Sequence, residues 1–328
     1  MTSSGLPLGG HSHFLQSRRP WLVSVVLGCI PFASAAIPSP PTPPPPASWS
    51  GPQPDYDAAT RRDRIGRIVV PVMVDGRGPF SFVLDTGANR TVLTAQLITA
   101  LGLKLNTGDT VEMNGVTGAA IVPTAYIDRL AVGDITLVQQ TFPVANGLSS
   151  DIDGILGVDG LADMRVLVNF RQQHVQVRLA GEVPPLRDVK RIPARFRFGR
   201  LILVNCRVGH VRAQAVIDTG SQYTLGNESL LEALDLKRDY TTTPSVIDVI
   251  GETLARQPGE RRAVSEINIG DVRVKRWTVA FGKFYVFKLW NLESTPTLVI
   301  GMDLLGELDT LAIDYQHREV QFRALERQ

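Results

Sequence analysis

Cysteine is scarce in this sequence, with only Cys29 and Cys206 among 328 residues. If a leader containing Cys29 is removed, Cys206 has no partner, and a framework of disulfides within the chain is excluded. Cys206 ends an apolar run, which favours a buried small side chain over a reactive thiol. We therefore expect the fold to depend on its hydrophobic cores rather than on covalent cross-links.

Sequence signals for metal, nucleotide and nucleic-acid binding are also missing. The five histidines show no HExxH or comparable ligand spacing, so we predict no metal site. The chain has no Walker-type glycine-rich loop and no GxGxxG between a strand and a helix, and we predict no cofactor. A formal net charge of +2 gives no electrostatic reason to expect a nucleic-acid partner.

The first 36 residues have the pattern of a signal peptide. Arg18 and Arg19 precede an apolar run at 21–30, and small residues follow at 33–36. The run is shorter than the roughly 20 residues that a membrane-spanning helix needs, so we expect no stable membrane span after cleavage. An uncleaved membrane anchor is the alternative. The pattern predicts export, to the periplasm or by secretion.

Two details of this leader bear on the export route. The paired arginines resemble a twin-arginine signal, although ordinary secretory leaders also carry them. Residues 26–29, Val-Leu-Gly-Cys, loosely resemble a lipidation signal, but the apolar stretch continues past Cys29, which argues against a lipid anchor there. Residues 37–64 contain a proline-rich run and predict an extended linker, because such a segment lacks the apolar side chains of a core.

The rest of the chain repeats one pattern of strands and turns. In each half, two strands lead into Asp-Thr-Gly, and a helix-like stretch (94–101 and 228–234), a Gly-Asp hairpin and an apolar-apolar-Gly sequence follow. Short alternating strands with glycine-rich turns predict an all-β fold with few short helices. We expect two pseudo-symmetric lobes, at 65–180 and 192–328, joined by a linker at 181–191.

The Asp-Thr-Gly triplet begins at Asp85 in the first half and at Asp218 in the second. A single copy would indicate a surface turn, since Asp and Gly both favour turns. Here two apolar residues precede each triplet, and a carboxylate at the end of a buried strand is unfavourable unless something compensates it. Matching carboxylates in both halves therefore indicate one paired site.

These motifs resemble those of the aspartic peptidases of the pepsin and retropepsin type. Both halves contain apolar-apolar-Asp-Thr-Gly-Ser/Ala, and the run at 153–157, Asp-Gly-Ile-Leu-Gly, is similar to the later pepsin-like motif. Two short lobes without evident disulfides resemble a single chain with two retropepsin-like lobes more than a full pepsin. The resemblance covers about residues 66–323 and implies two β-barrel lobes with the active site at their interface.

The resemblance implies that Asp85 and Asp218 are catalytic. The two loops bring the carboxylates together around one water, and like charges that close share a proton. One aspartate acts as base on the water, and the other, protonated, hydrogen-bonds the scissile carbonyl. The symmetry leaves open which is which.

Five neighbouring residues are implied to support this pair: Thr86, Gly87, Thr219, Gly220 and Ser221. The threonines hydrogen-bond the opposite loop, and the glycines let the backbone approach the carboxylates closely. The serine is able to hydrogen-bond the outer oxygen of Asp218. Ala88 stands at the serine's position in the first half and has no hydroxyl, so the two aspartates need not be electronically equal.

A peptidase of this type needs a hairpin that covers the substrate and excludes water. We assign the first such flap to Gly115, Val116, Thr117 and Gly118, and its counterpart to the stretch that begins at 249–252. Two surface hairpins without this role are the alternative. The aromatic-rich stretch at 283–290 is predicted as a core strand, with the wall of an apolar substrate pocket as the alternative.

These features together predict an exported aspartic endopeptidase that acts as a monomer on peptide or protein substrates. The alternative is a non-catalytic peptide-binding or scaffolding module on the same fold, and a narrow processing enzyme with one partner is a third hypothesis. Both aspartates and both threonines count against a binding module, because a binder gains little from two mutually repelling carboxylates.

Overall fold

The structure, a computed structural model, describes residues 55–324 except 134, 147, 149, 160, 162, 183, 198, 200 and 237–244. The signal peptide predicted at 1–36 and the proline-rich stretch at 37–54 lie outside the described residues, so both stay predictions. In the part of the chain that is described, no helix is long and apolar enough to cross a membrane.

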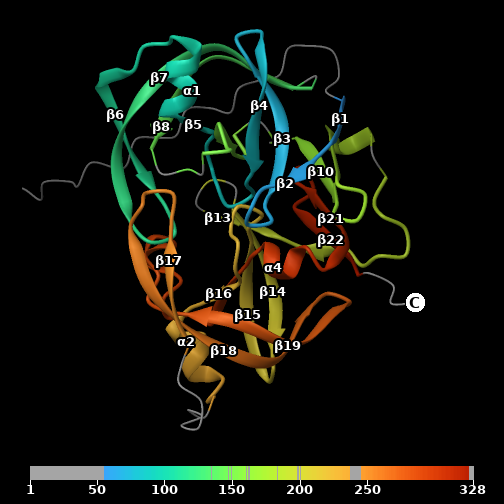
Figure 1. The fold of residues 1–328 in the computed structure, drawn as a ribbon. Helices are drawn as coiled ribbons and strands as arrows, with labels where there is room; N and C mark the ends of the chain where they lie inside the picture. The colour runs from blue at the N-terminus through green and yellow to red at the C-terminus, as the bar shows by residue number, and fades with distance from the viewer. Residues whose placement is uncertain are drawn as a thin grey trace, which may run out of the picture. The chain divides into compact units, whose positions relative to one another are not determined.

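The first lobe is a sheet that closes on itself. Its described strands run in the order β2-β3-β4-β9-β5-β8-β7-β6, and a further pairing of β3 with β7 closes the sheet (Figure 1). Alternate side chains of a strand face the same side of the sheet. On the inner side lie Val70, Val72 and Phe82, each at most 1% exposed. The strand bounds are β2 (Arg61–Arg62), β3 (Ile68–Val74), β4 (Arg77–Leu84), β5 (Val92–Thr94), β6 (Asn106–Asn114), β7 (Ala119–Val132), β8 (Ile135–Ala145) and β9 (Gly154–Leu156).

The second lobe repeats this plan. Its described strands run in the order β13-β14-β15-β20-β16-β19-β18-β17, and β14 also pairs with β18. Each strand has a counterpart at the same place in the first lobe, so the predicted all-β fold with two pseudo-symmetric lobes is confirmed. The strand bounds are β13 (Arg195–Arg197), β14 (Leu201–Val208), β15 (Val211–Ile217), β16 (Leu225–Gly226), β17 (Ser245–Ile250), β18 (Arg256–Ile269), β19 (Val272–Phe281) and β20 (Thr297–Ile300).

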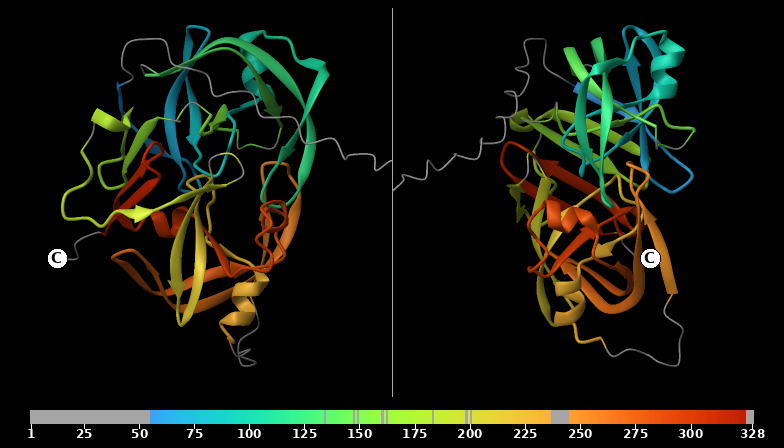
Figure 2. Two further views of the ribbon diagram at one scale, coloured as in Figure 1. Left: turned by 180° about the vertical axis from the view of Figure 1, so that it is seen from behind. Right: turned by 90° about the vertical axis from the view of Figure 1, so that its left-hand side faces the viewer.

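The two lobes share a third sheet, in the order β1-β11-β10-β21-β22-β12. The closing strand β10 of the first lobe pairs antiparallel with β21 of the second, and Figures 1 and 2 show these strands side by side. The linker predicted at 37–64 is too long at its C-terminal end, because β1 pairs with β11 and β2 with β3. The strand bounds are β1 (Asp55–Ala59), β10 (Met164–Asn169), β11 (His174–Leu179), β12 (Ile192–Pro193), β21 (Leu308–Asp314) and β22 (Glu319–Ala324).

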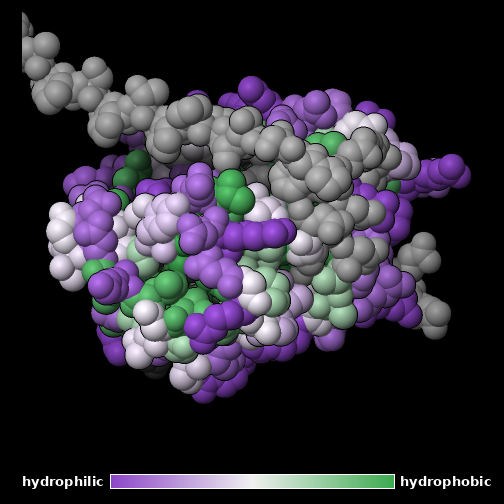
Figure 3. Space-filling model, turned by 90° about the horizontal axis from the view of Figure 1, so that it is seen from above, coloured by the Kyte–Doolittle hydropathy of each residue, from purple (hydrophilic) through white to green (hydrophobic). Residues whose placement is uncertain are grey.

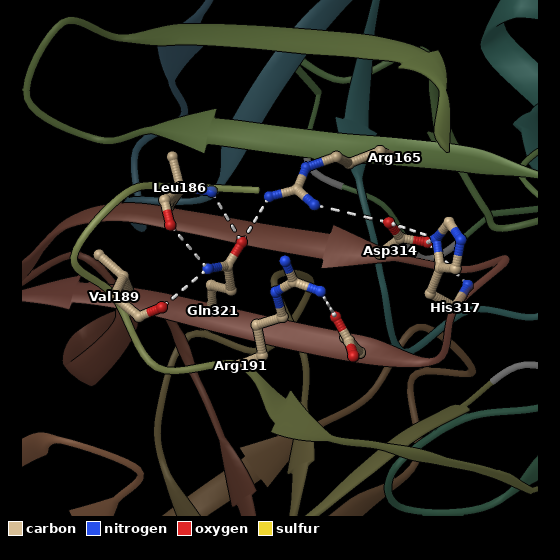
Figure 4. A network of polar contacts seen from close by, with 8 residues as sticks. Arg165, Leu186, Val189, Arg191, Asp314, His317 and Gln321 are labelled. Atoms are coloured by element: carbon tan, nitrogen blue, oxygen red, sulfur yellow. Dashed lines mark hydrogen bonds and ion pairs between the residues drawn. The ribbon is translucent and has the colours of Figure 1, made fainter. Parts of the chain in front are cut away.

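A buried polar network crosses the shared sheet (Figure 4). The guanidinium of Arg165 on β10 donates to Asp314 on β21 at 3.5 Å and to the side-chain oxygen of Gln321 on β22 at 2.6 Å. The amide nitrogen of Gln321 donates to the carbonyls of Leu186 and Val189, at 3.1 and 3.0 Å. The network therefore holds the segment between the lobes against the closing strands of both.

The helices are short, and two of them lie where the sequence predicts. Helix α1 (Ala95–Leu101) begins where the Thr94 hydroxyl accepts the N–H of Leu97 at 3.1 Å, and it ends at Gly102, whose φ is 65°. Helix α2 (Glu228–Ala233) begins in the same way, with the side chain of Asn227 accepting the N–H of Leu230 at 2.9 Å. The other described helices are a 3₁₀ turn (Ala180–Glu182), α3 (Tyr285–Leu289) and α4 (Met302–Leu305).

On the face of the molecule seen from above, the side chains of the described residues are mostly polar. Figure 3, the view from above, shows hydrophilic side chains around small groups of hydrophobic ones.

Inside the second lobe, Cys206 is only 9% exposed, so the prediction of a buried cysteine is confirmed. Burial raises the pKa of its thiol to about 12.

Candidate active site

The two aspartates of the repeated triplets lie at equivalent points of the lobes. Asp85 follows β4 and Asp218 follows β15, and each of these strands has a parallel neighbour, β9 or β20. The N–H of Asp85 donates to the carbonyl of Leu156 at 3.0 Å, and the N–H of Asp218 to that of Ile300 at 3.1 Å. The side chains are buried, with 7% and 5% of each residue exposed. The backbone thus holds both carboxyl groups at the ends of buried strands.

The glycines of the triplets show how closely the two loops approach each other. A Cβ atom added to Gly87 would lie 2.6 Å from Cγ of Asp218, and a Cβ added to Gly220 would lie 2.2 Å from Cγ of Asp85. Both distances are well inside van der Waals contact, so a larger residue does not fit without displacing the carboxyl group. Asp85 and Asp218 therefore lie at one site between the lobes.

The threonines of the triplets connect the two loops. The hydroxyl of Thr86 donates to the carbonyl of Ile217 at 2.8 Å, and that of Thr219 donates to the carbonyl of Leu84 at 2.6 Å. Each hydroxyl also accepts the backbone N–H of the other threonine, at 3.1 Å in both directions. Both threonines are fully buried. This is the cross-lobe bonding that the resemblance implies for them.

The two carboxyl groups have unequal hydrogen-bond partners. Oδ1 of Asp85 accepts the N–H of Gly87 at 2.7 Å, whereas Oδ1 of Asp218 accepts two N–H groups, from Gly220 at 2.9 Å and Ser221 at 3.1 Å. The predicted bond from the Ser221 hydroxyl to Asp218 is wrong. That hydroxyl donates instead to the carbonyl two residues along the chain, at 2.9 Å, as serines in turns commonly do.

Burial raises the pKa of both aspartates. The charge of Asp218 raises the pKa of Asp85 further, to well above its usual range. For Asp218, burial and then the charge of Glu252 raise the pKa to about 6, and the N–H of Gly220 opposes the rise. A hydrogen bond between the carboxyl groups raises the pKa of Asp85 and lowers that of Asp218, so the two groups titrate as a pair.

Two threonine–aspartate pairs support the loops from behind, and the sequence reasoning missed them. The N–H and hydroxyl of Thr91 donate to the carboxylate of Asp159 at 2.9 and 2.7 Å. In the second lobe, the hydroxyl of Thr224 donates to Asp303 at 2.7 Å. A signal was present in the sequence, because each threonine follows its triplet aspartate by six residues (91 − 85 and 224 − 218).

Two hairpins, one from each lobe, meet over this site. The turn at 115–118 joins β6 to β7, and the turn at 251–255 joins β17 to β18 (Figures 1 and 2). The hydroxyl of Thr117 donates to the carbonyl of Ala255 at 2.7 Å and accepts the N–H of Gly251 at 3.0 Å. The residues predicted as the first flap are therefore bonded to the tip of the second hairpin.

Helix α3 of the second lobe contacts the first hairpin from the side. The N–H of Val286 donates to the carbonyl of Val116 at 3.0 Å, and the hydroxyl of Tyr285 donates to the side-chain oxygen of Asn114 at 2.8 Å. The core strand predicted at 283–290 is wrong, since this stretch forms α3. Three of its four aromatic side chains, Phe284, Phe287 and Trp290, pack in a separate core cluster of the second lobe.

A cavity of about 390 Å³ extends between the hairpins and the aspartates. The paired carboxyl groups and both hairpin tips line it. One apolar wall is formed by Val286, Leu289 and Trp290. The alternative prediction for the stretch at 283–290, the wall of an apolar pocket, therefore describes its position better than a core strand does. Glu252, from the second hairpin tip, adds a third carboxyl group to the lining.

Comparison with known proteins agrees with this arrangement. No curated protein matches the chain. A family model described as aspartyl protease matches residues 70–159 and 204–304, one segment in each lobe. The matched segments include Asp85 and Asp218 with the rest of their triplets. The chain therefore belongs to the aspartyl protease family.

Proposed function

We propose that the protein is an aspartic endopeptidase in which Asp85 and Asp218 activate a water molecule for attack on a peptide carbonyl. One observation carries the proposal: two buried carboxyl groups from equivalent loops meet at the floor of a cavity. Membership of the aspartyl protease family supports hydrolysis of peptide bonds as the reaction. Two raised pKa values at one site are also typical of acid–base chemistry.

The unequal hydrogen bonds favour Asp218 as the base and Asp85 as the acid. Asp218 accepts two backbone N–H groups and Asp85 accepts one, so the anion is better stabilised at Asp218. The water gives a proton to Asp218 as its oxygen adds to the carbonyl carbon, while Asp85 protonates the carbonyl oxygen. When the C–N bond breaks, Asp218 returns its proton to the leaving nitrogen, and one hydroxyl of the intermediate returns a proton to Asp85.

The hairpins supply the cover that this reaction needs. Their joined tips lie over the cavity above the aspartates, which limits the access of bulk water to the reacting groups. Thr117 bonds across the two tips, so these hydrogen bonds must break before a long peptide can enter the cavity. Both aspartates come from one chain, which supports a monomeric enzyme, and the leader pattern supports an exported one.

Replacement of either aspartate tests the proposal. Asp85→Asn and Asp218→Asn are expected to lower kcat/KM on a diverse peptide library by at least about a hundredfold, since each removes one acid–base group. Asp271→Asn, in an exposed hairpin turn, serves as the matched control and is expected to cleave normally. Full activity in either triplet variant contradicts the proposal. Wild-type protein that binds these peptides but cleaves none would indicate a non-catalytic binding module instead.

A further inference from the structure

Glu252 holds a position that the dyad chemistry does not require. It lies in the turn between β17 and β18 and lines the same cavity as the paired aspartates. The turn is fixed: the N–H of Leu254 donates to the carbonyl of Gly251 at 2.9 Å, and Gly251 donates to Thr117 of the first hairpin. The Glu252 carboxyl group is therefore held above the dyad by the contacts that join the two hairpin tips.

The Glu252 side chain has no hydrogen bond or ion pair with any other residue that the structure describes. Two arginines near the site are already engaged. Arg67 donates to Asp63 at 2.8 Å, and Arg90, which lines the cavity, donates to the carbonyl of Thr141 at 2.9 Å. A carboxyl group that is partly removed from water, without a cation beside it, is unfavourable when ionised.

The surroundings of Glu252 also affect how readily its carboxyl group ionises. Burial and then the charge of Asp85 raise its pKa, while a hydrogen bond from its own backbone N–H and the charge of Arg67 lower it. Glu112, from the first hairpin, is the other glutamate of the cavity lining, but it is exposed and accepts a hydrogen bond from Asn114 at 3.2 Å. Glu252 is thus the half-buried, unpaired carboxyl group on the substrate side of the proposed catalytic centre.

We propose that Glu252 is a specificity-determining residue that binds a cationic group of the peptide beside the scissile bond. The cation is a lysine or arginine side chain, or the free amino group of a peptide cut near its N-terminus. This inference rests on the proposed function, because it takes the cavity as the place where the peptide binds. A cation next to Glu252 supplies the missing partner, and charged hydrogen bonds in such a site discriminate strongly between substrates.

Peptide profiling with matched variants tests the inference. Peptide sets that differ only in lysine, arginine, glutamine or norleucine at each position near the cut are supplied with free and with acetylated N-termini. The wild-type enzyme is expected to favour one cationic position, and Glu252→Gln to lower that preference in kcat/KM by at least about tenfold. Loss of the preference on acetylation assigns the cation to the amino terminus, and its persistence assigns it to a side chain.

Two further variants sharpen the result. Glu252→Lys is expected to move the preference towards glutamate or aspartate at the same position, because the local charge is reversed. Glu112→Gln removes an equal charge from the exposed side of the cavity and is expected to keep the cationic preference. An equal loss in Glu112→Gln and Glu252→Gln would overturn the inference, since it would show a general field effect. A wild-type enzyme with no cationic preference would overturn it too.

Failure of the inference is distinguishable from failure of the proposed function. Cleavage that depends on Asp85 but shows no effect of Glu252→Gln leaves the peptidase intact and removes only the specificity role. If the wild-type protein cleaves nothing, calorimetry with the same peptides decides the question. Tighter binding of the cationic peptides that disappears in Glu252→Gln supports the inference, and equal binding of cationic and neutral peptides contradicts it.

Discussion

Thr86 and Thr219 bond each other reciprocally, with the N–H of each donating to the hydroxyl of the other at 3.1 Å. The two hydroxyls in turn donate to backbone carbonyls of the opposite lobe. Because every donor and acceptor in this arrangement is buried, the geometry of the paired aspartates depends on both lobes being assembled.

Replacement of Thr86 by Val tests this dependence. The substitution keeps the shape of the side chain but leaves the Thr219 N–H without an acceptor and the Ile217 carbonyl without a donor. A buried unsatisfied group lowers the free energy of unfolding by about 1–3 kcal/mol. Urea denaturation should show this loss, together with a fall in kcat/KM because the carboxyl groups lose their fixed separation.

The matched control for this change is Thr86→Ser, which keeps the hydroxyl. It is expected to retain most of the stability and activity that Thr86→Val loses. If the two variants behave alike, the cross-lobe hydrogen bonds do not explain the effect, because only Thr86→Val removes the hydroxyl.

Gly220 is predicted to tolerate no side chain. A Cβ at this position would overlap the carboxyl group of Asp85, at distances of 2.2–2.6 Å. Gly220→Ala therefore displaces the carboxyl group of Asp85, and under the proposed mechanism we expect at least about a hundredfold loss of kcat/KM, as for loss of a positioned acid–base group. Gly181→Ala is the control, because a Cβ there meets no atom within 4 Å. Equal activity of the two variants would show that the loop adapts to the added methyl group.

The doubled local patterns of the sequence allowed much of this fold to be predicted. The strand at Ile68–Val74 and the helix after Thr94 follow from alternation and capping, and the second copy of each supported the first. The triplets were found in the same way, because apolar residues lead into both of them. Repetition therefore replaced the information that an alignment of related sequences would otherwise give.

Features that depend on distant contacts were not predictable in this way. Arg165 and Asp314 are 149 residues apart, and no local pattern indicates that β10 and β21 pair in a shared sheet. The aromatic run at 283–290 has no period that separates a strand from a short helix, so α3 was taken for a strand. Glu252 is a glutamate in a polar turn, and its place above the aspartates arises only when two hairpins from different lobes meet.

The raised pKa of Asp218 predicts that the free energy of unfolding decreases as the pH rises. Well below its ordinary pKa of 3.8 this carboxyl group is protonated in the folded and unfolded chains alike, so its burial does not lower the stability there. As the pH rises through about 6, the unfolded chain gains from ionisation while the buried group resists it, and stability is lost. Asp218→Asn does not ionise, so its free energy of unfolding relative to wild type should rise by about 2–3 kcal/mol between pH 4 and pH 7.5.

Urea titrations of wild type and Asp218→Asn across this pH range check the prediction. The comparison uses the change with pH rather than the absolute difference, because the amide alters local hydrogen bonds at every pH. A constant difference between the two proteins from pH 4 to pH 7.5 would mean that Asp218 has an ordinary pKa in the folded chain.

The same group should set the acid side of the activity profile. If Asp218 is the base and Asp85 the acid, kcat/KM rises as the pH increases through about 6 and Asp218 ionises, while the raised pKa of Asp85 favours its protonated form. The pKa of Asp218 is raised mainly by burial and then by the charge of Glu252. Glu252→Gln removes that charge, so the acid limb should move to lower pH by about half a unit or more.

An uncharged peptide is the substrate for this measurement, so that the effect on Asp218 is separated from any ion pair with the substrate. Glu112→Gln is again the control, because Glu112 is exposed and its charge is screened by solvent. An acid limb that stays in place in Glu252→Gln would show that the two carboxyl groups do not interact when the enzyme is active. Movement in both variants would instead show that the limb responds to the net charge of the cavity rather than to the one carboxyl group above the dyad.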